Sequence, residues 1–338
     1  MQAKLAPPWS ASGRPVSDKP AFPCVTKTTS LPFVFPPSHL THRQFLALTE
    51  DLRVPWNIKK SGTAFEPVFV SLGFVWDIPS KTVSLPKEKR EKYLARVESL
   101  LGADMVSLKD LQKVHGTLSY STFVYRDGSS RLPAISNAFR FYANDNALRH
   151  ILRTTRRALL WWKHRLTSPD FSRQLVATAP MQDLGLFVDA STSWGLGVII
   201  GEKWFALRLI KGWDCAGTRD ICWLEAVALE VLLMWLIERG HHDCCLLVHS
   251  DNTGAIGALS KGRSSNAELN RVARRFCNLS LSHNISISFS YIASASNPAD
   301  PISRGILPHS FPLYLSFDLP FDITQSLSCV DYVELSQS

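Results

Sequence analysis

The chain has 338 residues, of which 45% are hydrophobic and 20% are charged, a globular balance that excludes disorder throughout. Its length predicts two ordered units rather than one. The formal net charge of +8 favours polyanionic partners, nucleic acid above all, over a basic protein that has no such partner.

Cysteine usage and hydropathy indicate an intracellular protein. The seven cysteines are an odd number without a C-x-x-C pair, which indicates reduced thiols rather than a disulfide framework or a zinc knuckle. The N-terminal segment lacks the apolar stretch of a secretory signal. The most apolar stretch, residues 223–238, is shorter than the ~20 residues of a membrane span and contains three glutamates. We therefore expect no membrane contact, and a place in the nucleus or the cytoplasm.

The first predicted parts are an arm and a small α/β region. Residues 1–38 are rich in Pro and Ser, and the prolines interrupt every periodic pattern, which predicts a disordered arm. Residues 39–135 form the second part. It should contain a short helix over 42–52 and strands within 65–78.

Two further helices are predicted before residue 135. The first should have Pro86 at its first position and Gly102 at its C-cap, with apolar residues on one face between them. The second should begin at Ser107, whose spacing to Asp110 matches a capping box. Their apolar faces predict that the two helices pack together after the strands.

A basic connection is predicted over residues 136–180, with a helix over about 144–166. Basic residues alternate there with Trp161 and Trp162; they are Arg149, Arg153, Arg156, Arg157, Lys163 and Arg165. A basic helix with aromatic residues suits a phosphate backbone. A solvated charged face with the tryptophans buried at a domain junction remains the alternative.

Residues 181–306 alternate regularly between strands and helices. Two of the strands flank Gly201, which predicts a hairpin. A long helix should follow over about 220–239. The full order, β-β-β-α-β-α-α-β-α, predicts an α/β fold with a mixed five-stranded sheet flanked by helices. Residues 307–338 are left as a C-terminal extension, either packed or loose.

Acidic residues end two of the apolar strands. Asp189 and Asp251 both occupy positions where a carboxylate is costly unless it is paired, hydrogen-bonded or bound to metal. Since the carboxyl ends of strands in open α/β sheets form the ligand crevice, we expect both residues there. Either residue alone could instead be a turn or cap residue, but together they favour a site.

Two more carboxylates complete the candidate metal site. Glu225 and Glu230 lie about 140° apart around the long helix, so that only one can face the crevice. We choose Glu225, which is nearer the helix start, and keep Glu230 as the alternative. Asp300 begins the last short helix, where its alternative role is to stabilise the first turn. Together the four acids Asp189, Glu225, Asp251 and Asp300 could hold two Mg²⁺ ions about 4 Å apart, with Mn²⁺ as a substitute.

Four segments carry a family resemblance. In chain order they are FVDASTSWGLGVII, WLEAVALEVLL, VHSDNTGAIGAL and ASNPADPISRG. They resemble the four motif blocks of the ribonuclease H domain of retrotransposon polyproteins, especially of DIRS-type elements, and the resemblance covers residues 184–304. It implies a ribonuclease H-like fold and hydrolysis of the RNA strand of RNA:DNA hybrids.

The same resemblance assigns the site residues. It implies that Asp189, Glu225, Asp251 and Asp300 are the catalytic, metal-binding carboxylates. Three polar residues would be neighbours of the site, with local turn and cap bonding as their alternative role; they are Ser250, Asn252 and Asn297. The loop before Asp300 reads ASAS where cellular ribonucleases H carry a histidine, which implies impaired turnover.

Residues 39–135 carry a second resemblance. The segments VSLGFVWDIPSKTVSLPKEKREK and LQKVHGTLSY resemble the end of the palm and the thumb of the same elements' reverse transcriptase, so that this part is expected to be a truncated polymerase region. The polymerase site requires adjacent aspartates, and the sequence contains no such pair. Polymerase activity is therefore not expected.

Three functional hypotheses follow. The first is a magnesium-dependent endoribonuclease that acts on RNA:DNA hybrids. The second is a catalytically inactive, nucleic-acid-binding relic of a reverse transcriptase and ribonuclease H polyprotein. The third is a fragment that associates with an intact reverse transcriptase. Oligomeric state stays open.

Overall fold

The protein is seen as a computed structural model that describes residues 41, 43–44, 47, 66–169, 171–176 and 179–330. The chain divides into two compact units, Met1–Leu72 and Gly73–Ser338. The arm predicted over 1–38 and most of the helix predicted over 42–52 lie outside the described residues. Strand β1 (Val68–Ser71) belongs to the first unit, and all elements below belong to the second.

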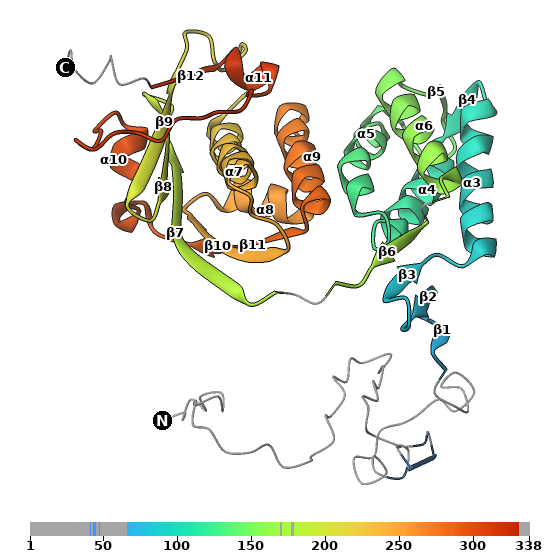
Figure 1. The fold of residues 1–338 in the computed structure, drawn as a ribbon. Helices are drawn as coiled ribbons and strands as arrows, with labels where there is room; N and C mark the ends of the chain where they lie inside the picture. The colour runs from blue at the N-terminus through green and yellow to red at the C-terminus, as the bar shows by residue number, and fades with distance from the viewer. Residues whose placement is uncertain are drawn as a thin grey trace, which may run out of the picture. The chain divides into compact units, whose positions relative to one another are not determined.

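Residues 73–176, here the helical part, begin the second unit (Figure 1). In chain order its elements are β2 (Phe74–Asp77), β3 (Thr82–Ser84), α3 (Lys87–Gly102), β4 (Met105–Ser107), α4 (Leu108–Ser121), η2 (Arg126–Arg131), α5 (Pro133–Ser136), η3 (Phe139–Phe141), β5 (Leu148–His150), α6 (Arg153–Thr167) and β6 (Ser172–Gln174). Strands β2, β3 and β6 pair antiparallel. Buried faces of α3, α4 and α6 form one hydrophobic core.

Local sequence signals explain where two of these helices begin. Helix α4 starts after Ser107, whose Oγ accepts a hydrogen bond from the Asp110 amide at 3.1 Å, so that the predicted capping box is confirmed. Helix α3 starts after Pro86, which is the N-cap rather than the first helical residue. Gly102 is the last residue of α3 and Ala103 is the C-cap, one position later than predicted.

The predicted helix over 144–166 is wrong in its first part. Helix α6 begins only at Arg153, and residues Leu148–His150 form β5, which pairs antiparallel with β4. Asparagine side chains that bond to nearby backbone compete with helix formation, and Asn144 accepts from the Asn146 amide at 3.1 Å. Trp162 is fully buried in the core of the helical part, so that it is not available to a nucleic acid.

Residues 179–330, here the sheet part, hold a mixed six-stranded sheet in the order β11-β10-β7-β8-β9-β12. In chain order the elements are β7 (Met181–Ala190), β8 (Gly195–Ile200), β9 (Lys203–Leu209), α7 (Ile221–Glu238), β10 (Cys244–Ser250), α8 (Thr253–Lys261), α9 (Ala267–Ser282), β11 (Ile285–Tyr291), η4 (Ser294–Ser296), α10 (Asp300–Ser303), α11 (Phe321–Thr324) and β12 (Leu327–Cys329). Strand β10 is parallel to β7 and β11, whereas β7, β8, β9 and β12 are antiparallel to one another along the sheet.

The predicted order of strands and helices is confirmed, and the sheet gains one strand. Strand β12 comes from the extension after residue 307 and pairs with β9, for example Leu327 with Leu209. The predicted hairpin at Gly201 is also present, because Ile200 pairs with Lys203 around that glycine at φ 61°. The sheet therefore has six strands rather than the five expected, and part of the extension is packed.

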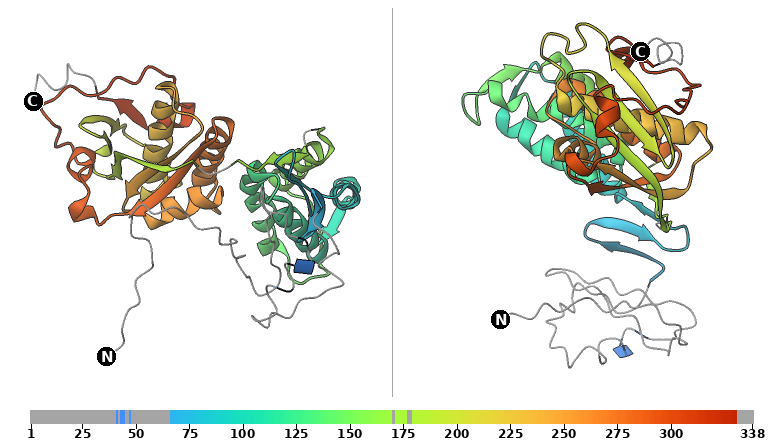
Figure 2. Two further views of the ribbon diagram at one scale, coloured as in Figure 1. Left: turned by 60° about the horizontal axis from the view of Figure 1, so that its bottom comes forward. Right: turned by 90° about the vertical axis from the view of Figure 1, so that its left-hand side faces the viewer.

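The sheet part buries one large core between the sheet and its helices. Helices α7, α8 and α9 gather on one face of the sheet, and α10 packs against β7 and β8 (Figures 1 and 2). Helix α7 is buried along nearly its whole length, which explains why its sequence is apolar on all sides. Among the described residues, no helix has the length and apolar character needed to cross a membrane.

Candidate metal centre

Asp189 lies near the end of β7 and is 2% exposed. Both of its carboxylate oxygens accept hydrogen bonds from the last motif block. Ser303 donates its hydroxyl to Oδ2, and Asn297 donates from Nδ2 to Oδ1 at 3.3 Å and to the Val188 carbonyl at 2.9 Å. The side chain of Asp189 is therefore fixed in orientation by residues more than a hundred positions later in the chain.

Glu225 lies in the second turn of α7 and is also 2% exposed. The helix begins after Asp220, whose side chain accepts from the Trp223 amide at 3.0 Å. The Oε1 atom of Glu225 accepts from the Ala190 amide at 3.1 Å, next to Asp189 on β7. Its Oε2 atom is buried and has no hydrogen-bond partner among the described residues.

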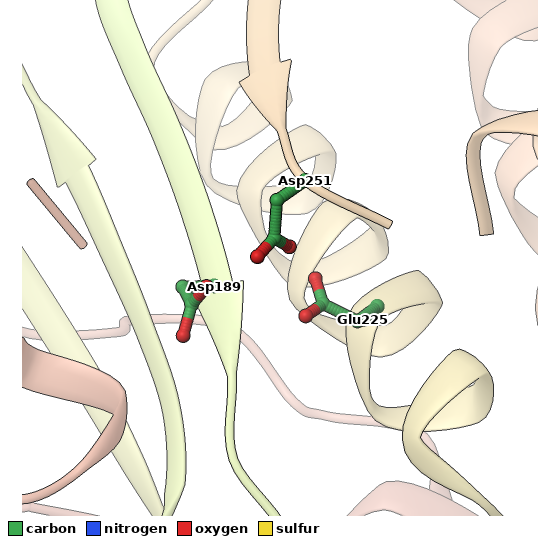
Figure 3. A group of neighbouring side chains, drawn as sticks. All are labelled: Asp189, Glu225 and Asp251. Carbon is green, nitrogen blue, oxygen red and sulfur yellow. The ribbon is translucent and has the colours of Figure 1, made fainter. Parts of the chain in front are cut away.

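Asp251 follows β10 directly and is half-buried. Ser294, in the loop that reads ASAS, donates its hydroxyl to the Oδ2 atom of Asp251. Because β10 runs parallel to β7, the ends of the two strands bring Asp251 close to Asp189. One carboxylate oxygen each from Asp189, Glu225 and Asp251 lies within 4.8 Å of the other two, and the three side chains face one another (Figure 3).

Burial and mutual repulsion make the charged form of this cluster unfavourable. Burial, followed by the charges of Asp189 and Asp251, raises the pKa of Glu225 to about 9, against the Ala190 hydrogen bond, which lowers it. Burial raises the pKa of Asp189 to about 6, with the Ser303 hydrogen bond opposing and the charges of Asp251 and Asp300 adding to the rise. Protons or a bound cation must compensate the three carboxylates.

The donor set fits a hard divalent cation. All three groups offer carboxylate oxygen, the ligand type preferred by Mg²⁺ and Mn²⁺. A buried carboxylate oxygen without a partner costs free energy, and Oε2 of Glu225 is such an atom among the described residues, on a carboxylate that points toward Asp189 and Asp251. The described residues thus form a group that could hold a metal ion.

Asp300 is near this cluster but is not one of the three converging acids. It is the first residue of α10, and its two carboxylate oxygens accept from Arg304, Nε to Oδ2 at 2.9 Å and Nη2 to Oδ1 at 2.8 Å. Glu230, the alternative to Glu225, faces a different environment on α7, where Arg275 binds both of its oxygens. The structure therefore brings together three of the four expected acids and holds the fourth in an ion pair.

The polar neighbours named from sequence have different contacts. Asn297 reaches Asp189, as described above. Asn252 instead caps α8 by accepting from the Ala255 amide at 2.9 Å, and Ser250 accepts from the Asn252 amide at 3.3 Å. Both of these contacts are the local turn and cap bonds of the alternative interpretation.

Sequence reasoning missed the contributions of Ser303, Ser294 and Gly197. Ser303 lies in the last motif block, three residues after Asp300, so that its position in that block could have been a signal. Gly197 pairs with Asp189 across β7 and β8, and a Cβ atom there would lie 2.8 Å from Ile302 Cβ and 2.9 Å from the Ser303 amide nitrogen. The glycine thus allows α10 to bring Ser303 onto Asp189.

Comparisons with known proteins give little further information. No protein-family model matches the chain, and no curated protein matches it. A structure of the foamy viral protease-reverse transcriptase in complex with double-stranded DNA is similar at 13% identity, covering 68% of this chain and 38% of that chain, with a TM-score of 0.29. A structure of the foamy viral protease-reverse transcriptase with an RNA/DNA hybrid is similar at 14% identity, covering 77% and 33%, with a TM-score of 0.29. This chain therefore covers less than half the length of either, and similarity at this level establishes neither fold nor function.

Proposed function

We propose that the protein is a metal-dependent endoribonuclease that hydrolyses the RNA strand of RNA:DNA hybrids. One observation carries the proposal: the buried carboxylate of Glu225, whose Oε2 has no hydrogen-bond partner among the described residues, faces Asp189 and Asp251 at the end of the central strands. Such a group requires a proton or a cation, and the ordered motif blocks indicate which enzyme family uses a metal ion in this place. A retrotransposon origin, within the DIRS-type resemblance, is part of the same proposal.

In this proposal Asp189, Glu225 and Asp251 hold the first divalent ion, and Asp300 contributes to a second. Magnesium or manganese bound there would supply charge stabilisation at the phosphate and activation of water. The protein's own contribution is orientation, because Asn297 and Ser303 fix Asp189 and the Ala190 amide fixes Glu225. Burial of these carboxylates keeps bulk water away from the ligands.

Nucleic acid is the proposed partner, and exposed arginines support binding to its phosphates. Arg153, Arg156 and Arg157 are all exposed on α6, together with Arg149 on β5. Guanidinium groups bind phosphate oxygens in a planar, two-bonded geometry that carries no sequence preference. Sequence-independent binding with a strong salt dependence is therefore expected.

The test is hybrid cleavage by the purified full-length chain. With Mg²⁺ or Mn²⁺ we expect cleavage of labelled RNA in an RNA:DNA hybrid but not in duplex RNA. Asp251→Asn and Glu225→Gln should each reduce the rate at least about a hundredfold, because each removes a ligand of the ion. Asp318→Asn, which neutralises an exposed carboxylate of the extension, is the matched control and should leave the rate unchanged. Equal rates in all four proteins would contradict the proposal.

A catalytically inactive, nucleic-acid-binding relic is the second candidate. The ion pair of Asp300 with Arg304 favours it, because a carboxylate engaged by the protein's own cation is not free for a metal ion. Salt-sensitive hybrid binding without cleavage, equal in the wild type and in Asp251→Asn, would support this candidate over the nuclease.

A further inference from the structure

Arg304 lies at the boundary between the acidic cluster and solvent. Its side chain is 55% exposed, whereas the Asp300 side chain that it binds is 24% exposed. Two parallel hydrogen bonds at 2.8 and 2.9 Å join the guanidinium to the carboxylate one helical turn away. This is the planar two-bonded arrangement in which an arginine and a carboxylate pair most strongly.

Ser303 connects Asp300 with the three converging acids, because its hydroxyl lies within hydrogen-bonding distance of both Asp189 Oδ2 and the backbone carbonyl of Asp300. After burial, the charges of Asp251 and Asp300 both raise the pKa of Asp189, and the charge of Arg304 lowers it. Hydrogen bonding to Asp300 raises the pKa of Arg304, and Asp189 and Asp251 contribute to that rise. The charge of the Arg304 guanidinium therefore acts on Asp189 and Asp251 as well as on Asp300.

A divalent ion and this guanidinium compete for the same carboxylate. An ion at Asp300 would lie beside a fixed positive charge, and like charges at such separations repel. Among the described residues, Asp189, Glu225 and Asp251 accept no hydrogen bond from a charged side chain, because their contacts are to neutral hydroxyl and amide groups. The three converging acids should therefore accept a metal ion more readily than Asp300 does.

The exposure of Arg304 also determines what could remove it from Asp300. An arginine that is half-exposed and bound to a carboxylate can exchange it for a phosphate, which offers the same two-bonded geometry. Under the proposed function, a nucleic-acid backbone would bring phosphates to this surface when substrate binds. Asp300 would then become free for an ion at the time the substrate is present.

We propose that Arg304 acts as an internal counter-cation for Asp300, so that the protein alone has one strong divalent-ion position and gains a second when a nucleic-acid phosphate binds the guanidinium. The strong position is the one formed by Asp189, Glu225 and Asp251. The inference rests on the proposed function, since it concerns how that same site is loaded.

Calorimetric titration of the metal-free, full-length protein with Mn²⁺ tests the first half. We expect one strong ion in the wild type, with any second ion bound at least about fivefold more weakly. Arg304→Gln should strengthen the second ion by about fivefold or more, and adding Asp300→Asn to that variant should remove the gain. Arg208→Gln, which removes an exposed arginine from β9, is the charge-matched control and should behave as the wild type.

A short DNA duplex, added as the phosphate probe, tests the second half. It should strengthen the second Mn²⁺ in the wild type by about fivefold and have little effect in Arg304→Gln. Two equally strong ions in the wild type without DNA, or one ion in both proteins under all conditions, would overturn the role of Arg304 and leave the proposed function standing. No Mn²⁺ uptake by any of the folded proteins would overturn both.

Discussion

Helix α7 carries two buried glutamates, of which one is paired with an arginine and the other is not. Glu225 is 2% exposed and Glu230 is fully buried. Arg275 binds both oxygens of Glu230, with Nη2 to Oε2 at 2.8 Å, and its Nη1 also binds both oxygens of Asp322 at 2.9 Å. Glu225 receives only one backbone amide, and its second oxygen has no partner among the described residues.

The comparison separates a structural carboxylate from one that is available to a ligand. Burying a carboxylate is costly unless it is paired, and at Glu230 the protein supplies the paired cation from α9. At Glu225 the charges that act on the carboxylate are those of Asp189 and Asp251, which add to the cost. Among the described residues, no cation comparable to Arg275 pairs with Glu225. We therefore infer that a proton or a metal ion compensates the burial of its carboxylate.

The largest effect is expected in the closed cluster, which consists of Glu230, Arg275 and Asp322, when its cation is removed. Arg275→Met would leave Glu230 and Asp322 as buried charges without a cation, and we expect a loss of about 3–5 kcal/mol in the free energy of unfolding. Urea denaturation at neutral pH measures it. Adding Glu230→Leu to the same variant should recover part of the loss, because one uncompensated charge is then gone. A loss below about 1 kcal/mol would show that the ion pairs are not structural.

The sequence predicted the open cluster, which is Asp189, Glu225 and Asp251, better than the closed one. Asp189 and Asp251 could be placed at strand ends because both follow apolar runs, and Glu225 could be preferred to Glu230 because it lies near the helix start. The proximity of these three acids agrees with that reasoning, whereas their role as metal ligands stays a prediction. Arg275 gave no comparable signal, because its spacing in α9 says nothing about partners in α7 and α11.

Other features escaped prediction for physical reasons that differ. The sequence left two roles open for Asp300, an acid in the first helical turn or a metal ligand. Its ion pair with Arg304 depends on side-chain geometry, which the sequence alone does not give. Strand β12 has three residues, too few to show a strand pattern. The predicted start of α6 is too early because basic residues also occur before the helix, at Arg149 and His150 in β5.

The second effect concerns the pH dependence that an open cluster should cause. The pKa of Glu225 is raised from 4.5 to about 9, so that the folded state favours the protonated acid. Its contribution to stability is therefore fully present below about pH 4.5 and is lost as the pH rises toward 9. In EDTA, Glu225→Gln should become more stable than the wild type by about 1 kcal/mol per pH unit above pH 5.

Urea denaturation of both proteins at pH 5, 6.5 and 8 checks this expectation. Because Asp189 is present in both proteins, the difference between them reports mainly on Glu225. Saturating Mn²⁺ at pH 8 should remove the deficit of the wild type, since the ion binds the deprotonated form. A difference between the proteins that stays constant across this pH range would contradict the assignment of Glu225 as the unpaired acid.

A third test disturbs the open cluster through packing and leaves the closed one untouched. Gly197→Ala would place a Cβ atom 2.8 Å from Ile302 Cβ, so that α10 must move away from β8 and take Ser303 from Asp189. We expect a loss of about 1–3 kcal/mol in stability, together with weaker Mn²⁺ binding.

The matched control for this variant is Gly257→Ala in α8. No described atom lies within 4 Å of a Cβ there, and alanine favours a helix over glycine, so that stability should rise by up to about 1 kcal/mol. Thermal denaturation and Mn²⁺ titration of the two alanine variants give both readouts. Unchanged Mn²⁺ binding in Gly197→Ala would mean that α10 does not orient Asp189.

The smallest effect is expected at Asn252, beside the open cluster, and it distinguishes a helix-capping role from a metal-binding role. Asn252 follows Asp251 directly, yet its Oδ1 atom accepts from the Ala255 amide and so caps α8. Asn252→Ala should therefore cost about 1 kcal/mol, and Asn252→Ser, which can make the same cap, should recover most of it. Mn²⁺ affinity measured on both variants distinguishes the roles: if affinity falls equally in the serine and alanine variants, Asn252 contributes to metal binding. If affinity is retained in the serine variant, Asn252 supports the site only by fixing where α8 begins. The contrast between Glu225 and Glu230 is then explained without a metal-binding role for Asn252.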